Sequence, residues 1–237
     1  MQKAGKMQKN NCLQIKKYVI VVAGGKGSRM GGEIPKQFRL ISGRPVLMHT
    51  LEAFYKYDPE IELILVLPEA HLSYWDELCT QYRFTLRHRV VRGGETRFHS
   101  VKNGLDTLPE SGLVAVHDGV RPLVAQKVIS SAFEEAERSG AVIPVIEMTD
   151  SLRELTPDGK SKAVSRNLYR GVQTPQVFST VLLKEGYRQP FCKQFTDDAS
   201  VVEAAGKEVT LIKGNPENIK ITTPMDLLLA EILLSHV

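Results

Sequence analysis

The sequence has little cysteine and lacks long apolar runs. Its 237 residues include three cysteines, Cys12, Cys79 and Cys192, which lie far apart and form no C-x-x-C pair. Neither a zinc site nor a disulfide framework is therefore indicated, and we expect a reducing cytoplasm as the compartment. No apolar stretch approaches the ~18 residues that a membrane-spanning helix needs, so we expect no membrane partner.

An excess of charge is also missing from most of the chain. The formal net charge is +4, but five of the 31 basic residues (Lys3, Lys6, Lys9, Lys16 and Lys17) lie at the N-terminus. The remainder is near neutral, which gives no support for a nucleic-acid partner. Residues 1–17 lack the apolar centre of a secretory signal. We expect them to form a disordered leader.

Short apolar runs alternate with amphipathic segments along the rest of the chain. Strands are predicted over residues 18–23, 61–67, 88–91, 113–117, 141–146 and 208–212, and helices over 46–57, 70–82, 97–107, 125–138, 179–188, 197–205 and after Pro224. This order predicts an α/β fold with a Rossmann-like, mostly parallel twisted sheet and helices on both faces.

Residues 147–178 interrupt this alternation. They are polar and place the turn-forming Pro157-Asp158-Gly159 between two candidate strands. A hairpin that projects from the sheet would have this sequence. We therefore predict a single domain over residues 18–237, with a projecting β-arm at about 147–178.

Ligands of such sheets bind beyond the carboxyl ends of the strands, and a glycine-rich turn follows the first predicted strand. Its glycines, from Gly24 to Gly27, fit neither the P-loop spacing nor the dinucleotide pattern, because Met30 stands where a third glycine is required. Arg29 lies in the turn, and Lys36 follows the rigid Pro35. Two cations beside a glycine turn suit a nucleoside triphosphate.

Two further turns also follow predicted strands. In the first, Gly94 permits close backbone approach and the Ser100 hydroxyl could contact a base edge, whereas Arg97 could simply cap the turn. In the second, Asp118 ends an apolar strand, where a carboxylate commonly holds a metal or a substrate hydroxyl. We interpret the neighbouring His117 as a hydrogen-bonded structural residue.

Near the C-terminus, Lys220 is predicted at the tip of a strand, before a helix opened by Thr223 and Pro224. The segments AGGKGSRM, PKQF, GGETRFHSV, VHDGVRP, RNLYRGVQTPQVF, TDDASVVE and NIKITTPMDL occur in this order within residues 19–235. Together they resemble the 2-C-methyl-D-erythritol 4-phosphate cytidylyltransferase family, one of the sugar-nucleotide-type nucleotidyltransferases.

The chain departs from the family pattern at three places. Its turn reads Val22-Ala23-Gly24-Gly25 where the family often has Pro-Ala-Ala-Gly, Ser151 stands where threonine is common, and Gly119-Val120 replaces an alanine pair. The first and third changes also occur in related ribitol-phosphate cytidylyltransferases. The reaction type is therefore better indicated than the substrate.

The resemblance implies that CTP transfers its cytidylyl group to 2-C-methyl-D-erythritol 4-phosphate and releases pyrophosphate. It implies catalytic roles for Arg29, Lys36, Arg166 and Lys220; CTP binding by Ala23, Gly24, Gly25, Gly27, Gly94, Glu95 and Ser100; and substrate binding by Asp118, Arg121, Ser151, Arg166 and Thr174. Mg²⁺ or another divalent cation is expected, held by Asp118 or only through the CTP phosphates. Arms that clasp across a homodimer are expected to bring Arg166 into the neighbouring site.

Three alternatives stay open at this point. Ribitol-5-phosphate cytidylyltransferase would need nearly the same site. A nicotinamide-dependent dehydrogenase shares the alternation of strands and helices, but lacks the third glycine, and Glu52 lies within the apolar helix pattern. A non-enzymatic binding module would not explain why Lys36, Asp118 and Lys220 occur together.

Overall fold

A computed structural model of the chain describes residues 15–25 and 34–235. The predicted site residues Gly27 and Arg29, and most of the predicted leader, lie outside the described residues. The end of that leader was placed too far along the chain, because β1 begins at Lys17 and Lys16 forms an ion pair with Glu62.

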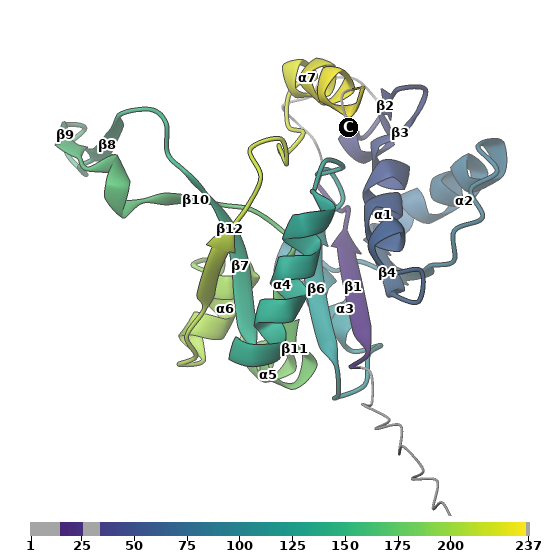
Figure 1. The fold of residues 1–237 in the computed structure, drawn as a ribbon, viewed down its shortest axis with the longest axis horizontal. Coiled ribbons are helices and arrows are strands. Elements are labelled where there is room, and N and C mark those ends of the chain that lie inside the picture. The colour runs from purple at the N-terminus through teal and green to yellow at the C-terminus, as the bar shows by residue number, and fades with distance from the viewer. Residues whose placement is uncertain (1–14, 26–33, 236–237) are drawn as a thin grey trace, which may run out of the picture.

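An eight-stranded mixed sheet forms the centre of the molecule (Figure 1). Its strands are β1 Lys17–Val22, β4 Glu62–Leu67, β5 Arg89–Arg92, β6 Leu113–Asp118, β7 Ala141–Glu147, β10 Arg170–Val172, β11 Gln176–Ser179 and β12 Thr210–Lys213. Strands β6, β1, β4 and β5 are neighbours and run parallel. Strand β11 lies between β6 and β7 and is antiparallel to both. Strand β12 pairs with β7 in parallel. The prediction of an α/β fold with a mostly parallel centre is confirmed.

The side chains of β1 point alternately to the two faces of the sheet, and both faces are covered by helices. Val19 and Val21 belong to one apolar core, and Tyr18, Ile20 and Val22 to another. The first core packs α1 Val46–Tyr57, α2 Leu72–Gln81 and α4 Gln126–Ser139, and the second packs α3 Arg97–Leu105, α5 Thr180–Gly186 and α6 Asp198–Ala204. Strands β1, β4 and β6 are therefore buried on both sides.

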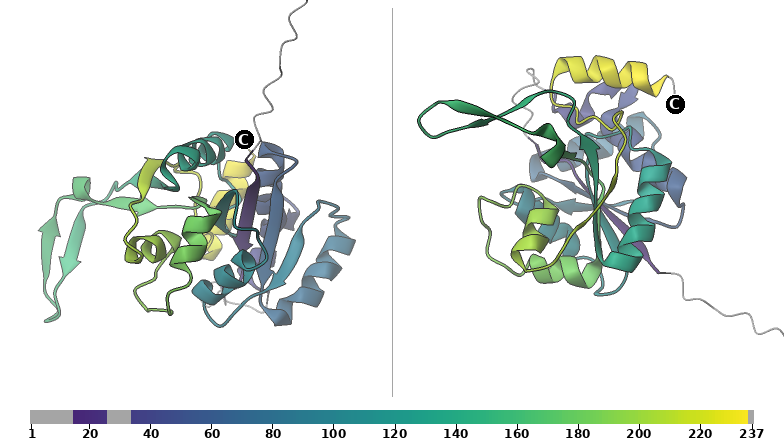
Figure 2. Two further views of the ribbon diagram at one scale, coloured as in Figure 1. Left: turned by 90° about the horizontal axis from the view of Figure 1, so that it is seen from below. Right: turned by 60° about the vertical axis from the view of Figure 1, so that its left-hand side comes forward.

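The projecting arm is shorter than predicted. Its hairpin consists of β8 Leu152–Leu155 and β9 Ser161–Val164, followed by the 3-10 turn η4 Arg166–Leu168. Figures 1 and 2 show this hairpin standing away from the body of the molecule. Residues 170–172 and 176–178 return to the main sheet, where Val177 and Phe178 are fully buried. The predicted arm at about 147–178 therefore includes residues that belong to the main sheet and its core.

The C-terminal helix α7 Pro224–Leu234 covers the edge of the sheet at which the parallel strands end (Figure 1). Thr223 caps it in a capping box with Asp226, and Pro224 occupies its first turn, as predicted. Ile221 and Ala230 pack with Ile41, close to the small hairpin of β2 Leu40–Ile41 and β3 Arg44–Pro45. Two further 3-10 turns are η2 Lys36–Phe38 and η3 Glu69–His71. In the part of the chain described, no helix is both long and apolar enough to cross a membrane.

Candidate active site

A cavity of about 290 Å³ opens at the carboxyl ends of β1, β4, β5 and β6, as expected for a sheet of this kind. The predicted site residues that line it are Ala23, Gly24, Gly25, Lys36, Gly94, Glu95, Ser100, Asp118 and Lys220. Arg121 and Thr174 contact Asp118 from behind this wall. Segments that are far apart in the sequence therefore meet at one place.

The first glycine turn is tied to the segment that carries Lys36. The Gln37 side chain is buried and donates a hydrogen bond to the carbonyl of Ala23 (2.8 Å). Phe38 is also buried and packs edge-on against Tyr74. These two anchors directly follow Lys36 in the chain. A side chain added at Gly25 would lie 3.5 Å from the Cε of Lys36. Lys36 therefore runs alongside the glycine turn.

The second glycine turn is closed by hydrogen bonds within the chain. The Gly94 N–H donates to Ser100 Oγ (3.1 Å), whose hydroxyl donates to the Thr96 carbonyl (2.9 Å). Here the Ser100 hydroxyl holds the turn against α3, and its contact with a base stays a prediction. A Cβ at Gly94 would overlap His99, so a larger residue at this position would disturb the turn.

Asp118 is the electrostatic centre of the site. Its side chain is 10% exposed and lies between three cations. Oδ2 is 3.0 Å from Lys220 Nζ and 3.2 Å from Arg121 Nε, and Oδ1 is 3.9 Å from Arg97 Nε. Burial alone would raise the pKa of this carboxyl, but the three cations together hold it well below its usual range. Asp118 is therefore a permanent anion and a hydrogen-bond acceptor.

The sequence left open that Arg97 simply caps the turn, but the cap of α3 is Thr96, whose side chain accepts from the N–H of His99. The Arg97 guanidinium reaches Asp198, 101 residues away, through two hydrogen bonds of 3.0 and 2.6 Å. The Tyr187 hydroxyl donates to the same buried carboxylate (2.6 Å). Burial would lower the pKa of Arg97, yet Asp198 and Asp118 raise it, so this cation is also permanent.

The TPQ segment of the sequence holds Asp198 in place. The buried Gln176 accepts hydrogen bonds from the N–H groups of Asp198 and Ala199 and donates to Asp197. Sequence reasoning assigned a binding or catalytic role to neither Arg97 nor Asp198, although both lie in segments of the family pattern. Arg97 and Asp198 are 101 residues apart, and nothing in the sequence shows that their two segments lie side by side beside the cavity.

His117 supports the site from inside the protein, which confirms its predicted structural role. Its Nε2 donates to the Arg121 carbonyl (3.0 Å), so Nδ1 accepts from the Thr174 hydroxyl (3.0 Å). The hydroxyl of Thr174 in turn accepts from the Asp118 N–H (3.1 Å). Burial lowers the pKa of His117 to about 4, so it is neutral at physiological pH.

Lys220 is carried by a loop and not by a strand tip, because β12 ends at Lys213. Arg121 donates to the Asn218 carbonyl (2.7 Å), and the Asn218 amide donates to the Thr174 carbonyl (2.8 Å). Ile221 also pairs with the backbone of Val120. These bonds fix the loop on both sides of Lys220.

Two predicted residues lie apart from the cavity. Ser151 precedes β8, and Arg166 opens the 3-10 turn that follows β9, so both belong to the projecting arm. The Arg166 guanidinium donates to the Thr149 carbonyl and thereby joins the outgoing and returning limbs of the arm. Neither residue lines the cavity of its own chain.

The residues that the structure describes do not form a dedicated metal centre. Within the described ranges, no group of three or more His, Cys, Asp or Glu side chains could hold a metal ion. Asp118 is a single carboxylate whose oxygens already face three cations. This arrangement disfavours Asp118 as a metal ligand and favours the alternative that the metal binds through the triphosphate.

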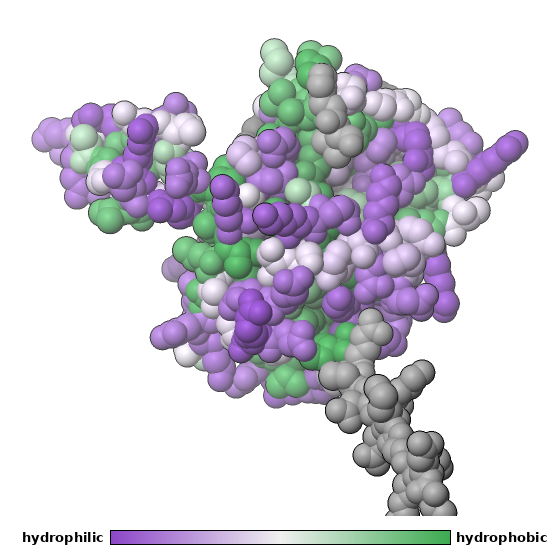
Figure 3. Space-filling view, viewed as in Figure 1, coloured by the Kyte–Doolittle hydropathy of each residue, from purple (hydrophilic) through white to green (hydrophobic). Residues whose placement is uncertain are grey.

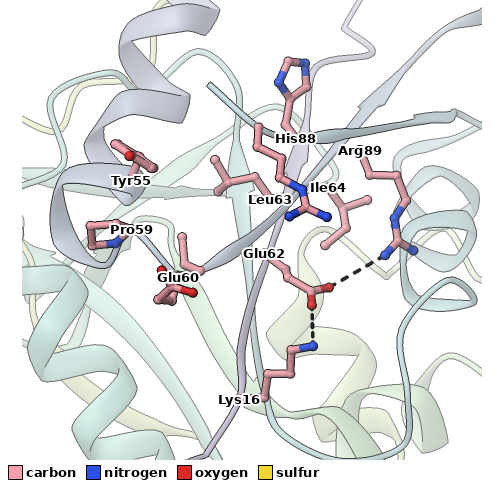
Figure 4. A pocket seen from close by; sticks show the side chains of 11 residues that line it. Lys16, Tyr55, Pro59, Glu60, Glu62, Leu63, Ile64, His88 and Arg89 are labelled. Carbon is pink, nitrogen blue, oxygen red and sulfur yellow. Dashed lines mark ion pairs between the residues drawn. The ribbon is translucent and has the colours of Figure 1, made fainter. Parts of the chain in front are cut away.

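A larger cavity, of about 570 Å³, lies at the opposite edge of the sheet, where β4 and β5 begin (Figure 4). Glu62 faces it and pairs with both Lys16 and Arg89. His88 is held by the Trp75 indole N–H (2.9 Å) and the Leu86 carbonyl. Glu62 and His88 thus already have ionic or hydrogen-bond partners, and none of the predicted site residues that the structure describes lines this cavity. We therefore place the chemistry in the smaller cavity.

Similar proteins of known structure share the fold over nearly the whole chain. A crystal structure of 2-C-methyl-D-erythritol 4-phosphate cytidylyltransferase from Thermus thermophilus is 33% identical, with a TM-score of 0.72 over 93% of this chain and 98% of that one. A crystal structure of 4-diphosphocytidyl-2C-methyl-D-erythritol synthase from Anaerococcus prevotii has a TM-score of 0.78 at 27% identity, over 93% of this chain and 99% of that one.

Sequence relatives lead to the same family. A protein from Phocaeicola vulgatus named 2-C-methyl-D-erythritol 4-phosphate cytidylyltransferase is 58% identical over 92% of this chain and 99% of its own length. One of the same name from Porphyromonas gingivalis is 54% identical over 94% of this chain and 100% of its own. The family model for this enzyme matches residues 17–236. The chain therefore belongs to the 2-C-methyl-D-erythritol 4-phosphate cytidylyltransferase family.

Proposed function

We propose that this chain transfers the cytidylyl group of CTP to 2-C-methyl-D-erythritol 4-phosphate, forming 4-diphosphocytidyl-2-C-methyl-D-erythritol and pyrophosphate in the non-mevalonate route to isoprenoid precursors. One observation carries the proposal: a glycine-lined cavity with Lys36 and Lys220 in its wall, in a chain that matches this family over residues 17–236. The comparisons do not favour the ribitol-phosphate alternative, and no observation supports a dehydrogenase or a binding module.

The attack requires little acid–base chemistry. The phosphate oxygen of the substrate is already an anion; it forms a bond to the α-phosphorus of CTP, and the bond to pyrophosphate breaks. The main obstacle is repulsion between the two phosphate groups, which cations and fixed orientation reduce. Lys36 beside the glycine turn, together with Arg29, would neutralise the triphosphate. Lys220, held against Asp118, would face the substrate phosphate.

Asp118 has a more specific role in this scheme. It stays ionised, so it can only accept hydrogen bonds. Its Oδ1 has the more distant cation, Arg97 at 3.9 Å, and is the oxygen better placed to accept from a hydroxyl of the ribose or the polyol. Mg²⁺ would enter as part of the CTP complex, bound mainly by phosphate oxygens and water.

A homodimer would complete the site. Arg166 and Ser151 lie on an arm that projects from the body (Figure 2), so they are proposed to act on the substrate phosphate of a neighbouring subunit. An isolated hairpin is marginally stable in water. The arm exposes Leu155 and Leu168 (78% and 83%), and Figure 3 shows apolar side chains gathered over α7. These surfaces are suited to burial against a second copy.

Pyrophosphate release tests the proposal. CTP, UTP, ATP and GTP would each be supplied with Mg²⁺ and either methylerythritol phosphate or ribitol 5-phosphate. We expect turnover with CTP and methylerythritol phosphate only. Faster turnover with ribitol 5-phosphate would identify the protein as a ribitol-5-phosphate cytidylyltransferase instead. No turnover with either polyol phosphate would refute the proposed function.

Dilution tests the shared site. Sedimentation and activity would be measured together from micromolar to nanomolar protein. A dimer that loses specific activity as it dissociates would support the proposal, whereas a fully active monomer would refute it. Residues 18–237 acting as one domain and a cytoplasmic location stay predictions.

A further inference from the structure

A second hollow lies at the root of the arm, away from the glycine-lined cavity. It has a volume of about 330 Å³ and is formed by residues 147–149 of the outgoing limb and by Arg166, Asn167 and Arg170 of the returning limb. Two arginines, four residues apart, thus face one space. Only Arg166 was predicted to bind substrate, and Arg170 has no assigned role.

Hydrogen bonds to the backbone orient both guanidinium groups. Arg166 donates from Nη1 to the Thr149 carbonyl, and Arg170 donates from Nη1 to the carbonyls of Asn167 (3.0 Å) and Tyr169 (2.8 Å). A guanidinium carries five N–H donors. Among the described residues these are the only hydrogen bonds of the two groups, so Nε and Nη2 of each remain available. Those two nitrogens form the fork that binds an oxyanion through two bonds.

The charge of the hollow also favours an anion. Among the described residues, Glu147 is the one acidic residue in its wall, and it stands opposite Arg170 in the antiparallel pairing of β7 with β10. Despite that register, no ion pair joins the two side chains within the described part of the chain. Two guanidinium groups against one carboxylate leave a net positive charge, and both arginines are exposed to incoming ligand.

We propose that Arg170 binds the phosphate group of the polyol substrate together with Arg166, so that the arm presents a pair of guanidinium groups to a phosphate monoester dianion. This inference rests on the proposed function, because it deepens the role given there to Arg166. A dianion that must approach the triphosphate of CTP is better neutralised by two cations than by one. Arg170 is therefore a specificity residue for the phosphorylated form of the polyol.

Steady-state kinetics of the full chain test the proposal with three variants. Arg170→Ala removes the whole group, and Arg170→Gln keeps an amide that can donate to the Asn167 or Tyr169 carbonyl but removes the charge. Arg153→Ala is the matched control, because this arginine lies on the same arm, bonds Ser161 and does not line the hollow. We expect both Arg170 variants to raise KM for the polyol phosphate about 10-fold, with KM for CTP unchanged. The control should leave both KM values unchanged.

Inhibition by inorganic phosphate distinguishes the substrate phosphate from the pyrophosphate product. Phosphate should compete with the polyol phosphate and should inhibit the Arg170 variants more weakly, whereas inhibition by pyrophosphate should not change. An unchanged KM for the polyol phosphate in either Arg170 variant would overturn the proposal, as would an equal rise in both KM values. Weaker inhibition by pyrophosphate alone would also overturn it.

Failure of the proposed function would be recognised separately. In that case the parent protein itself would not release pyrophosphate from CTP and methylerythritol phosphate. Binding of inorganic phosphate, followed by ³¹P NMR in parent and Arg170→Gln, would still decide whether this arginine holds a phosphate. Equal binding by the two proteins would overturn the inference.

Discussion

The ion pair between Arg97 and Asp198 offers the sharpest test of how the site is held together. Asp198→Asn keeps the size of the side chain and its bond from Tyr187, but removes the charge that faces the guanidinium. The Asp198 side chain is fully buried, whereas that of Arg97 is 31% exposed. Breaking a buried pair costs 3–5 kcal/mol. Because water and Asp118 partly compensate Arg97, we expect a loss of about 3 kcal/mol in the free energy of unfolding.

Urea denaturation would measure this loss, and a double-mutant cycle with Arg97→Gln would isolate the pair. Glu135→Gln provides the matched control, since it makes the same change in an exposed ion pair with Arg138 and should have little effect. We also expect a higher KM for CTP in Asp198→Asn, because Arg97 lines the cavity. An unfolding free energy within 0.5 kcal/mol of the parent, or a coupling energy near zero, would refute this account.

Three further results are expected. Lys36→Ala should lower kcat on the order of 10²-fold or more with a smaller effect on KM for CTP, whereas the exposed Lys207→Ala should not; equal turnover in all three proteins would contradict the role of Lys36. As the pH falls from 6.5 to 4, the unfolded protein binds a proton at His117 before the native protein does. The parent should therefore lose up to roughly 3 kcal/mol in the free energy of unfolding, and His117→Gln should lose less. The same dependence of unfolding free energy on pH in both proteins would contradict a buried, neutral His117. Purine triphosphates should not replace CTP in turnover, and comparable rates with ATP would contradict a cavity that selects pyrimidines.

Much of the fold could be predicted because the strands are buried on both faces. The runs at 18–23, 61–67 and 113–117 are almost entirely apolar, and the structure places β1, β4 and β6 there, within one or two residues. Strand β11 was missed because it is only four residues long and follows a polar segment. Its burial depends on insertion between β6 and β7, which no local pattern reveals.

The candidate site was predicted in the same uneven way. Residues after the strands, such as Gly94 and Asp118, could be found because parallel strands end at one edge of the sheet. Arg97 could not be distinguished from an ordinary capping residue, since its partner Asp198 begins a different helix on the same face. Pairing between the first turns of two helices depends on how the helices pack, not on either sequence alone.

Asp118 shows how tertiary contacts decide between roles that the sequence leaves open. Its position at the end of β6 suits either a metal or a hydroxyl group. The structure surrounds it with cations from three separate segments, which contribute Arg97, Arg121 and Lys220. A divalent metal at this carboxylate would have to displace positive charges that the loop around Asn218 and the bond to Asp198 hold in place. A neutral hydroxyl meets no such repulsion, and this difference makes hydroxyl binding the better assignment.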